Sequence, residues 1–286
     1  MGYRSRQVLA VLIGLLLLAG CGGDDDAATS RAPTIVATTT STQDSGLLDV
    51  LVPAFEKASG HGVKTVAVGS GQAIEMGSRG EADVVLAHSP AAEQEMMAAG
   101  KGRERRTVMH NDFVIVGPPS DPAHIRGTSA TQAMARIARG RADFISRGDD
   151  SGTNTFELNL WKKAEVTPHG SWYQESGQGM GPTLQIARDK AAYTISDRGT
   201  YLATQKGSDL KILVEGGDAL LNVYHVIDIP AANGKRVNAA GGKAFADWIV
   251  SPGTQELIRA FGVQKYGEPL FVPDAGKTDT EIVQAG

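Results

Sequence analysis

The chain has 286 residues, a formal net charge of −4, 41% hydrophobic residues and a single cysteine. The lone cysteine excludes an intramolecular disulfide, and the lack of any lysine and arginine cluster excludes the usual pattern of a nucleic-acid-binding protein. Beyond the N-terminal segment there is no long apolar run, so we expect a soluble part of about 250 residues that forms one large or two moderate domains.

The N-terminus has the pattern of a bacterial lipoprotein signal. Two arginines precede an apolar core at residues 8–18, which is too short to span a membrane comfortably. The sequence LAGC follows and, by resemblance to that signal class, places Cys21 at the lipidated position. We therefore predict a signal peptide at residues 1–20 and a flexible acidic tether at residues 21–33. An ordinary signal peptide or an uncleaved anchor is the alternative.

The first candidate site is a run of hydroxyl side chains in the sequence TIVATTTSTQDSGLLDVL. A strand is expected at residues 34–38, followed by Thr39, Thr40 and Ser41, with a helix beginning near residues 44–45. The first amides of a helix carry partial positive charge, and small hydroxyls add donors, so the pattern favours an oxyanion ligand. Plain helix capping by Ser41, with the aspartate three residues later, is the alternative.

The helix after this loop carries apolar residues at Leu47, Leu51 and Phe55 and a stop signal at Gly60. Because proline removes a helical hydrogen bond, we expect Pro53 to divide the segment into two short helices.

Two further strand ends follow. A strand at residues 63–68 ends in the glycine-rich turn VGSGQA, whose glycines allow close approach of backbone amides and whose Ser70 adds a hydroxyl donor. A structural turn is the alternative reading of this segment. A strand at residues 82–87 ends at His88, which we expect to be a neutral histidine with its hydrogen bonds satisfied. A position near the ligand cleft is the alternative for this residue.

The second candidate site is the sequence SRGDDSGTNTFE, which repeats the plan of a strand (residues 142–146), a polar turn and a helix. Arg147 supplies a permanent cation with directed donors, and Ser151 and Thr153 place hydroxyls beside free helix amides. The two aspartates between them are expected to hold Arg147 or to cap the helix. A solvated surface arginine is the alternative, and the Arg-Gly-Asp tripeptide also matches a short adhesion motif.

The remaining elements alternate between strand and helix patterns, which indicates an α/β architecture, and several strands are apolar without alternation, as parallel strands tend to be. Further strands are expected at 112–117, 192–196, 211–214 and 223–229. Helices are expected at 129–140 and 155–165, with two more in 242–262 separated at Pro252. The predicted core residues of that last pair are Phe245, Trp248, Ile249, Leu257, Ile258 and Phe261. The loop at residues 175–187 is expected to border the ligand cleft.

Catalytic patterns are missing from the sequence. The Gly-x-Ser-x-Gly spacing of a nucleophile elbow does not occur, and the six histidines show no metal-ligand spacing. We therefore expect no enzyme activity and no cofactor. An exported hydrolase that uses Ser41 or Ser151 remains a remote alternative.

Seven segments, in order, resemble the tungstate-binding lipoproteins of bacterial tungstate ABC transporters, a type II periplasmic-binding-protein family. They are ATTTSTQDSGLLD, AVGSGQA, GEADVVLAHSP, NDFVIVGP, SRGDDSGT, WYQESGQGMG and YTISDRGTYLA. The resemblance implies an α/β fold of two lobes with a ligand cleft between them. It departs at His225, where the family has a small residue.

The implied lobes are joined by two crossing segments, near residues 113–118 and 222–227. We predict that lobe 1 comprises residues 34–115 plus 226–286 and that lobe 2 comprises residues 116–225. Ligands of open α/β sheets bind at the carboxyl ends of the strands, so the two hydroxyl-rich loops would face each other across the cleft.

The resemblance further implies capture of tungstate and its delivery to a membrane permease with an ATPase partner. The family's binding residues correspond to Thr39, Thr40, Ser41, Arg147, Ser151 and Thr153, and Ser70 is added from its own loop. Molybdate is the nearest alternative ligand, and sulfate is a less favoured alternative. We expect an exported monomer that is anchored to the membrane by the lipid on Cys21.

Overall fold

A computed structural model describes residues 32–207 and 209–285. The predicted signal peptide at residues 1–20, the lipidation site Cys21 and all but the last two residues of the tether at 21–33 lie outside the described residues. Within the described ranges, no helix combines the length and the apolar character needed to cross a membrane.

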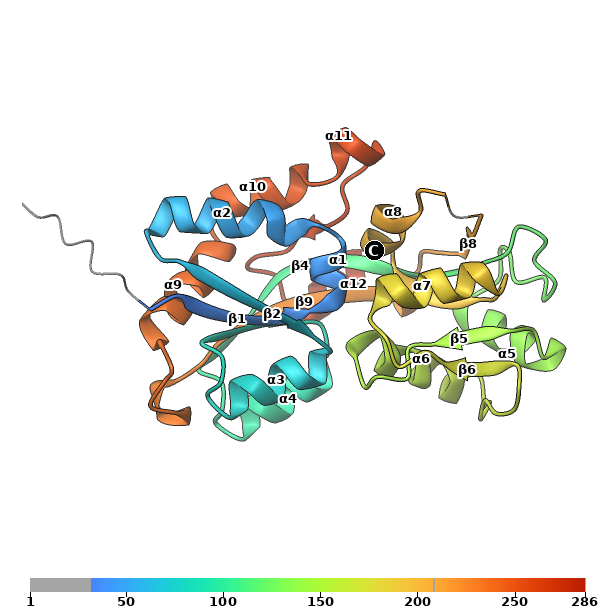
Figure 1. The fold of residues 1–286 in the computed structure, drawn as a ribbon, viewed down its shortest axis with the longest axis horizontal. Coiled ribbons are helices and arrows are strands. Elements are labelled where there is room, and N and C mark those ends of the chain that lie inside the picture. The colour runs from blue at the N-terminus through green and yellow to red at the C-terminus, as the bar shows by residue number, and fades with distance from the viewer. Residues whose placement is uncertain (1–31, 208, 286) are drawn as a thin grey trace, which may run out of the picture. The chain divides into compact units, whose positions relative to one another are not determined.

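Strands and helices alternate along the described chain, as the sequence predicts (Figure 1). The strands are β1 (Thr34–Thr39), β2 (Val63–Val68), β3 (Val84–Ala87), β4 (Glu104–Gly117), β5 (Phe144–Ser146), β6 (Tyr173–Glu175), β7 (Thr194–Asp197), β8 (Lys211–Val214), β9 (Leu221–Asp228) and β10 (Val272–Pro273). The helices are α1 (Thr40–Asp44), α2 (Leu47–Ser59), α3 (Ser70–Ser78), α4 (Pro90–Ala98), α5 (Ala130–Gly140), α6 (Gly152–Lys163), α7 (Met180–Asp189), α8 (Arg198–Thr204), α9 (Ala239–Ile249), α10 (Pro252–Ala260), α11 (Val263–Tyr266) and α12 (Asp279–Ala285), with 3-10 turns η1 (Asp218–Leu220) and η2 (Ala231–Asn233).

One large sheet has the strand order β10-β4-β9-β3-β1-β2, and β7 and β8 also pair with β4. Strand β1 is parallel to β2 and β3, and β5 is parallel to β6 in a separate small sheet. Strand β9 is antiparallel to β3 and β4, and β4 is antiparallel to β7 and β8. The predicted parallel pairing is therefore correct for β1, β2, β3 and β5, and the partner of β5, β6, was not predicted as a strand. An apolar run marks a strand covered on both faces without fixing its direction.

Strand β4 is long and belongs to two cores. Its first part, up to Asp112, pairs with β9, and its second part, from Phe113, pairs with β7 and β8. Val108 and Met109 are buried in one hydrophobic cluster, whereas Phe113 and Ile115 are buried in another. The described chain therefore forms two α/β lobes that share this strand, in agreement with the predicted two-lobe fold class.

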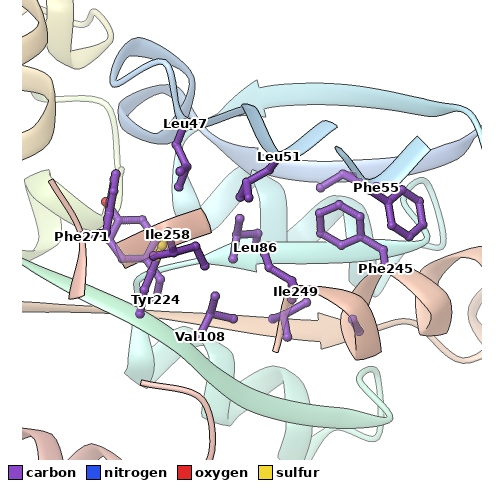
Figure 2. Packing of buried hydrophobic residues seen from close by; sticks show 14 of the residues in the cluster. Leu47, Leu51, Phe55, Leu86, Val108, Tyr224, Phe245, Ile249, Ile258 and Phe271 are labelled. Atoms are coloured by element: carbon purple, nitrogen blue, oxygen red, sulfur yellow. The ribbon is translucent and has the colours of Figure 1, made fainter. Parts of the chain in front are cut away.

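The core of the first lobe lies between α2, α9 and α10 on one side and the sheet on the other (Figure 2). Phe55 of α2 and Phe245 of α9 meet edge to face, with ring centroids 5.1 Å apart. Helix α2 follows β1, whereas α9 lies near the C-terminal end, so the two ends of the described chain build one core. Burial of each such aromatic side chain contributes roughly 1.5–3 kcal/mol. Helices α3 and α4 cover the opposite face of the sheet, with Ile74 and Met96 buried there.

The core of the second lobe is built from the middle of the chain. Ile137 of α5 and Trp161 of α6 pack with Phe144 of β5 in one cluster. Met180 of α7 and Tyr201 of α8 belong to a second cluster on the other side. The exact lobe boundaries at 115/116 and 225/226 stay a prediction.

Three local predictions are wrong. Pro53 lies inside the continuous helix α2, because Leu51 and Phe55 on either side of it are fully buried and their packing outweighs one missing hydrogen bond. The first helix starts at Thr40 instead of near residues 44–45, because the Thr39 side chain already caps it. Leu257 is 38% exposed, whereas its neighbour Ile258 is fully buried.

Candidate functional site

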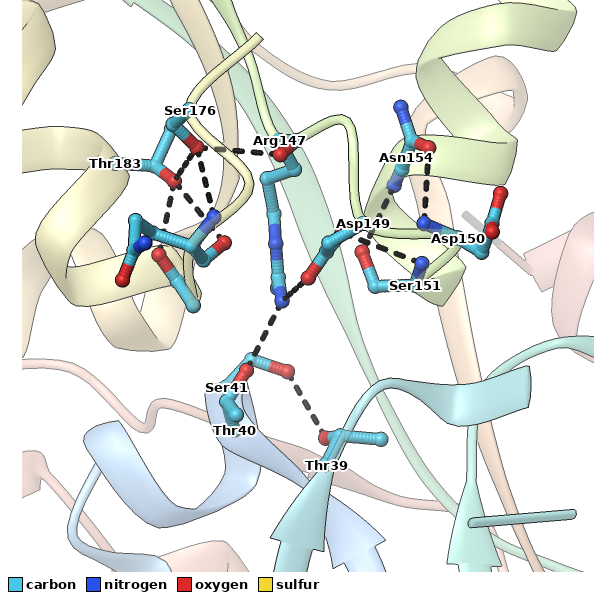
Figure 3. Close-up of polar contacts among 12 residues, drawn as sticks. Thr39, Thr40, Ser41, Arg147, Asp149, Asp150, Ser151, Asn154, Ser176 and Thr183 are labelled. Atoms are coloured by element: carbon cyan, nitrogen blue, oxygen red, sulfur yellow. Dashed lines mark hydrogen bonds and ion pairs between the residues drawn. The ribbon is translucent and has the colours of Figure 1, made fainter. Parts of the chain in front are cut away.

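The loops that follow β1, β2, β3 and β5 meet at one place between the lobes. Ser41 Oγ lies 3.3 Å from His88 Nε2, and Arg147 Nη2 donates to Thr40 Oγ1 at 3.1 Å. A Cβ atom at Gly152 would lie 2.8 Å from Ser70 Oγ, so the start of α6 touches the start of α3. The structure therefore brings together the loops of all seven predicted binding residues, and Figure 3 shows the Thr39–Ser41 segment opposite Arg147 and Ser151.

In the first loop, the hydroxyl groups form a connected network. Thr39 Oγ1 accepts from the backbone N–H of Thr42 at 3.2 Å and lies 3.0 Å from Ser41 Oγ and 2.7 Å from Thr42 Oγ1. Thr200 of α8 donates its hydroxyl to the carbonyl oxygen of Ser41 at 3.2 Å. Ser41 and Thr42 are buried, so this network holds the loop in one conformation.

In the second loop, Arg147 is 2% exposed, and its backbone carbonyl accepts from Gly177 N at 2.9 Å. Its guanidinium also forms an ion pair with Asp149, whose second carboxylate oxygen accepts from Ser151 N at 3.3 Å. Ser151 caps α6 by accepting from Asn154 N at 3.2 Å. The expectation that an aspartate of this loop holds Arg147 is therefore correct for Asp149.

Several contacts join the two loops and the helices behind them across the cleft. The Asp44 carboxylate at the end of α1 accepts from Gly181 N at the start of α7, at 3.1 Å. A Cβ atom at Gly179 would lie 3.4 Å from Thr40 Cβ. These contacts, together with the Arg147–Thr40 hydrogen bond, require the lobes to be closed on each other.

Three buried donors in this region have no hydrogen-bond partner, as do a few groups elsewhere in the described residues, such as Arg106 Nη2. Within the described residues, Ser70 Oγ, Thr153 Oγ1 and Arg147 Nε are buried and have no hydrogen-bond partner. Each comes from a loop at which a strand leads into a helix, and each can donate a hydrogen bond. Buried polar groups are nearly always paired, so such a set is suited to a ligand that brings only acceptors, such as a fully ionised oxyanion.

Two buried carboxyl groups lie near these loops and were not predicted from the sequence. Asp197 caps α8 by accepting from Thr200 N at 2.8 Å, and burial raises its pKa to about 6. Glu157 of α6 accepts from Ser146 Oγ at 2.7 Å, and burial raises its pKa to about 7. The Asp-x-x-Thr spacing at the end of β7 was a signal for the first cap, whereas no local pattern predicts the burial of Glu157.

The two histidines discussed from the sequence have different surroundings. Burial and the positive charge of Arg147 lower the pKa of His88 to about 3, so its ring is neutral at pH 7, as expected. The expectation that its hydrogen bonds are satisfied is wrong, because Nδ1 is buried without a partner. His225 lies in β9, where Nδ1 is 2.9 Å from the Glu93 carboxylate and Nε2 is 2.7 Å from that of Asp279. Its side chain therefore contacts α4 and α12.

Comparisons with known proteins agree with one another. A family model described as a PBP superfamily domain matches residues 25–253. The tungstate-binding protein TupA of Peptoclostridium acidaminophilum is 47% identical over 279 residues, which cover 94% of this chain and 98% of that protein.

Two solved structures are also similar. The tungstate ABC transporter structure from Geobacter sulfurreducens has 45% sequence identity and a TM-score of 0.73, with 79% of this chain and 97% of that chain covered. The tungstate-binding protein TupA from Desulfovibrio alaskensis G20 has 42% identity and a TM-score of 0.71, with 85% of this chain and all of that chain covered.

Proposed function

The chain belongs to the periplasmic-binding-protein (PBP) superfamily, and from this premise we propose that it is the substrate-binding protein of an ABC importer that captures tungstate. The names of the relatives support this ligand, since a 47% identical protein and a 42% identical structure are both described as tungstate-binding. Transport proteins of this kind bind and release an ion without covalent chemistry, and we assign no catalytic residue.

The observation that carries the proposal is the meeting of buried hydrogen-bond donors from separate loops. Burial of a dianion is strongly unfavourable unless donors surround it. Unpartnered buried donors on Ser70, Arg147 and Thr153 meet that need, and a neutral hydroxyl network lies opposite them. We propose that the ligand-binding residues are Thr39, Thr40, Ser41, Ser70, Arg147, Ser151 and Thr153.

Closure of the lobes around the ion is the proposed binding step. The ion binds to the loops of both lobes, and contacts such as Asp44 to Gly181 form only when the lobes meet. A ligand that touches both lobes favours the closed form by the free energy of those added contacts. The closed protein would then deliver the ion to the permease and its ATPase.

The remaining parts of the proposal concern the cell envelope. We propose that the chain is exported, that it is anchored to the membrane through a lipid on Cys21, and that it acts as a monomer. The LAGC sequence and the preceding apolar core support the anchor. Radiolabelled palmitate should be incorporated into the wild-type protein and not into a Cys21→Ala variant, and equal incorporation would rule out this anchor site.

Titration calorimetry and thermal melting with four anions test the ligand. Tungstate should bind and raise the melting temperature, because a ligand of the folded state stabilises it by mass action. Molybdate is the nearest competitor, since it has the same charge and nearly the same size. Sulfate or phosphate binding as tightly as tungstate would contradict the proposed selectivity. No binding of any of the four would contradict the proposed function.

A further inference from the structure

His88 contacts Ser41, one of the proposed anion-binding residues. It directly follows β3, is 5% exposed, and places Nε2 3.3 Å from Ser41 Oγ. Its ring centroid lies 4.6 Å from that of Tyr224 and 6.2 Å from that of Phe113. These aromatic neighbours pack beside the ring whose Nε2 contacts Ser41.

The hydroxyl group of Ser41 has one hydrogen and two acceptor positions. Thr39 Oγ1 lies 3.0 Å and His88 Nε2 lies 3.3 Å from its oxygen, and the Tyr224 hydroxyl also forms a hydrogen bond with Ser41. If Ser41 donated to one of these neighbours, its hydrogen would not be available to an oxyanion. If Thr39 and His88 both donate to Ser41, its hydrogen remains available to the ligand. A ring without hydrogen on Nε2 would either accept the Ser41 hydrogen or place its lone pair against that of Oγ. Anion binding by Ser41 therefore favours a hydrogen on Nε2 of His88.

The surroundings of the other ring nitrogen favour the same form of the ring. A Cβ atom at Gly152 would lie 2.9 Å from His88 Nδ1, so Nδ1 faces the first residue of the twelve-residue helix α6. The N-terminus of a helix carries partial positive charge, which favours a lone pair over an N–H group at this position. Among the described residues, Nδ1 has no hydrogen-bond partner, and Asn222 is a further side-chain hydrogen-bond partner of the ring. An unpaired lone pair is less unfavourable than an unpaired buried N–H.

We propose that His88 is a positioning residue for anion binding, and that its neutral ring donates from Nε2 to Ser41 Oγ and thereby directs the Ser41 hydroxyl hydrogen at the ligand. The inference rests on the proposed function. It adds a residue from the carboxyl end of β3 to the loops after β1, β2 and β5. Because burial and Arg147 keep the pKa of His88 low, the residue acts through hydrogen-bond geometry and adds no positive charge to the site.

A set of variants tests this role by calorimetry with tungstate. His88→Phe keeps a flat ring but removes the donor, and it should weaken binding about tenfold or more. His88→Gln can place an N–H near the Nε2 position and should stay within about threefold of the wild type. In a Ser41→Ala background, His88→Phe should have an additional effect below about twofold, because the group that it positions is gone.

The outcomes separate the inference from the proposed function. If the wild type binds tungstate and His88→Phe binds equally well, or if its effect is undiminished in the Ser41→Ala background, the inference is wrong. If the wild type binds no anion, the proposed function itself fails and the inference fails with it. Nitrogen-15 NMR of wild-type His88 gives a second measurement that needs no variant. A neutral ring with hydrogen on Nε2 supports the inference, and hydrogen on Nδ1 overturns it.

Discussion

Arg147 is the residue whose loss should affect binding most. Its guanidinium is buried, contacts Thr40 in the opposite loop and has an unpartnered Nε. Arg147→Ala should weaken tungstate binding by about 2 kcal/mol or more, as expected when a buried charged partner is removed. Calorimetry checks this value. Arg188→Ala, a change on the surface of α7, should bind like the wild type, and an unchanged affinity of Arg147→Ala would mean that Arg147 does not contact the anion.

Glu157 should make folding stability depend on pH. Burial raises its pKa from 4.5 to about 7 in the folded protein, so between these values the folded state binds more protons than the unfolded state. Stability from this residue is therefore fully present below about pH 4.5 and is lost as the pH rises through about 7, by about 3 kcal/mol at most.

Chemical denaturation of the wild type and of Glu157→Gln between pH 5 and 8 measures this contribution. As the pH rises, the unfolding free energy of the wild type should fall relative to that of Glu157→Gln, because the glutamine cannot ionise. Glu95→Gln, an exposed change on α4, serves as the control and should follow the wild type at each pH. A constant difference between Glu157→Gln and the wild type would show that Glu157 is already ionised when buried.

At the level of elements, helix α7 receives its N-terminal cap from the opposite lobe. Its own N-cap residue is Gly179, which has no side chain, and the Asp44 carboxylate accepts from Gly181 N instead. Asp44→Ala should therefore weaken tungstate and molybdate binding equally, by about 1 kcal/mol, because the cap forms only when the lobes close.

Two further variants isolate the capping effect of Asp44 in the same calorimetric titrations. Asp44→Asn retains a capping oxygen and should bind within about threefold of the wild type. Asp49→Ala removes an exposed carboxylate from the start of α2 and should have little effect. A loss of affinity for one anion and not for the other would mean that Asp44 acts on the ligand and not on closure.

At the level of the whole molecule, a disulfide across the cleft should lock the lobes together. A Cβ atom at Gly179 would lie 3.4 Å from Thr40 Cβ, close to the usual separation in a disulfide of about 3.5–4.5 Å. A protein with Thr40→Cys and Gly179→Cys lacks the Thr40 hydroxyl and should bind tungstate more weakly than the wild type when it is reduced. Once oxidised with tungstate present, it should release the ion during dialysis more slowly than after reduction. Each single cysteine variant is the control, and rapid release from the oxidised double variant would mean that exchange needs no opening.

The family and the two-lobe fold class were predictable from the resemblance of seven segments to a known family. The general positions of most strands were predictable because runs of apolar residues and turn residues are local signals. The convergence of Ser41 and Arg147 was also predictable, since carboxyl ends of strands in facing sheets meet at one cleft. The hydrogen bond of Asp44 to α7 and the role inferred for His88 were not, because they depend on how two lobes approach each other. The predictions for Pro53 and Leu257 were wrong for a different reason, because tertiary packing within the first lobe outweighed a local sequence rule.

The sharing of one core by both ends of the described chain sets an order of folding. Residues of α2 pack against α9 and α10, which are separated from them by the entire second lobe. The second lobe is nearly continuous in sequence, so its contacts close shorter loops and form sooner. As the chain emerges from the ribosome, Leu51 and Phe55 stay without their partners until Phe245 and Ile258 have been made. A chain that stops before residue 239 should therefore lack a stable first lobe, and near-ultraviolet circular dichroism and protease digestion of that fragment would reveal the loss.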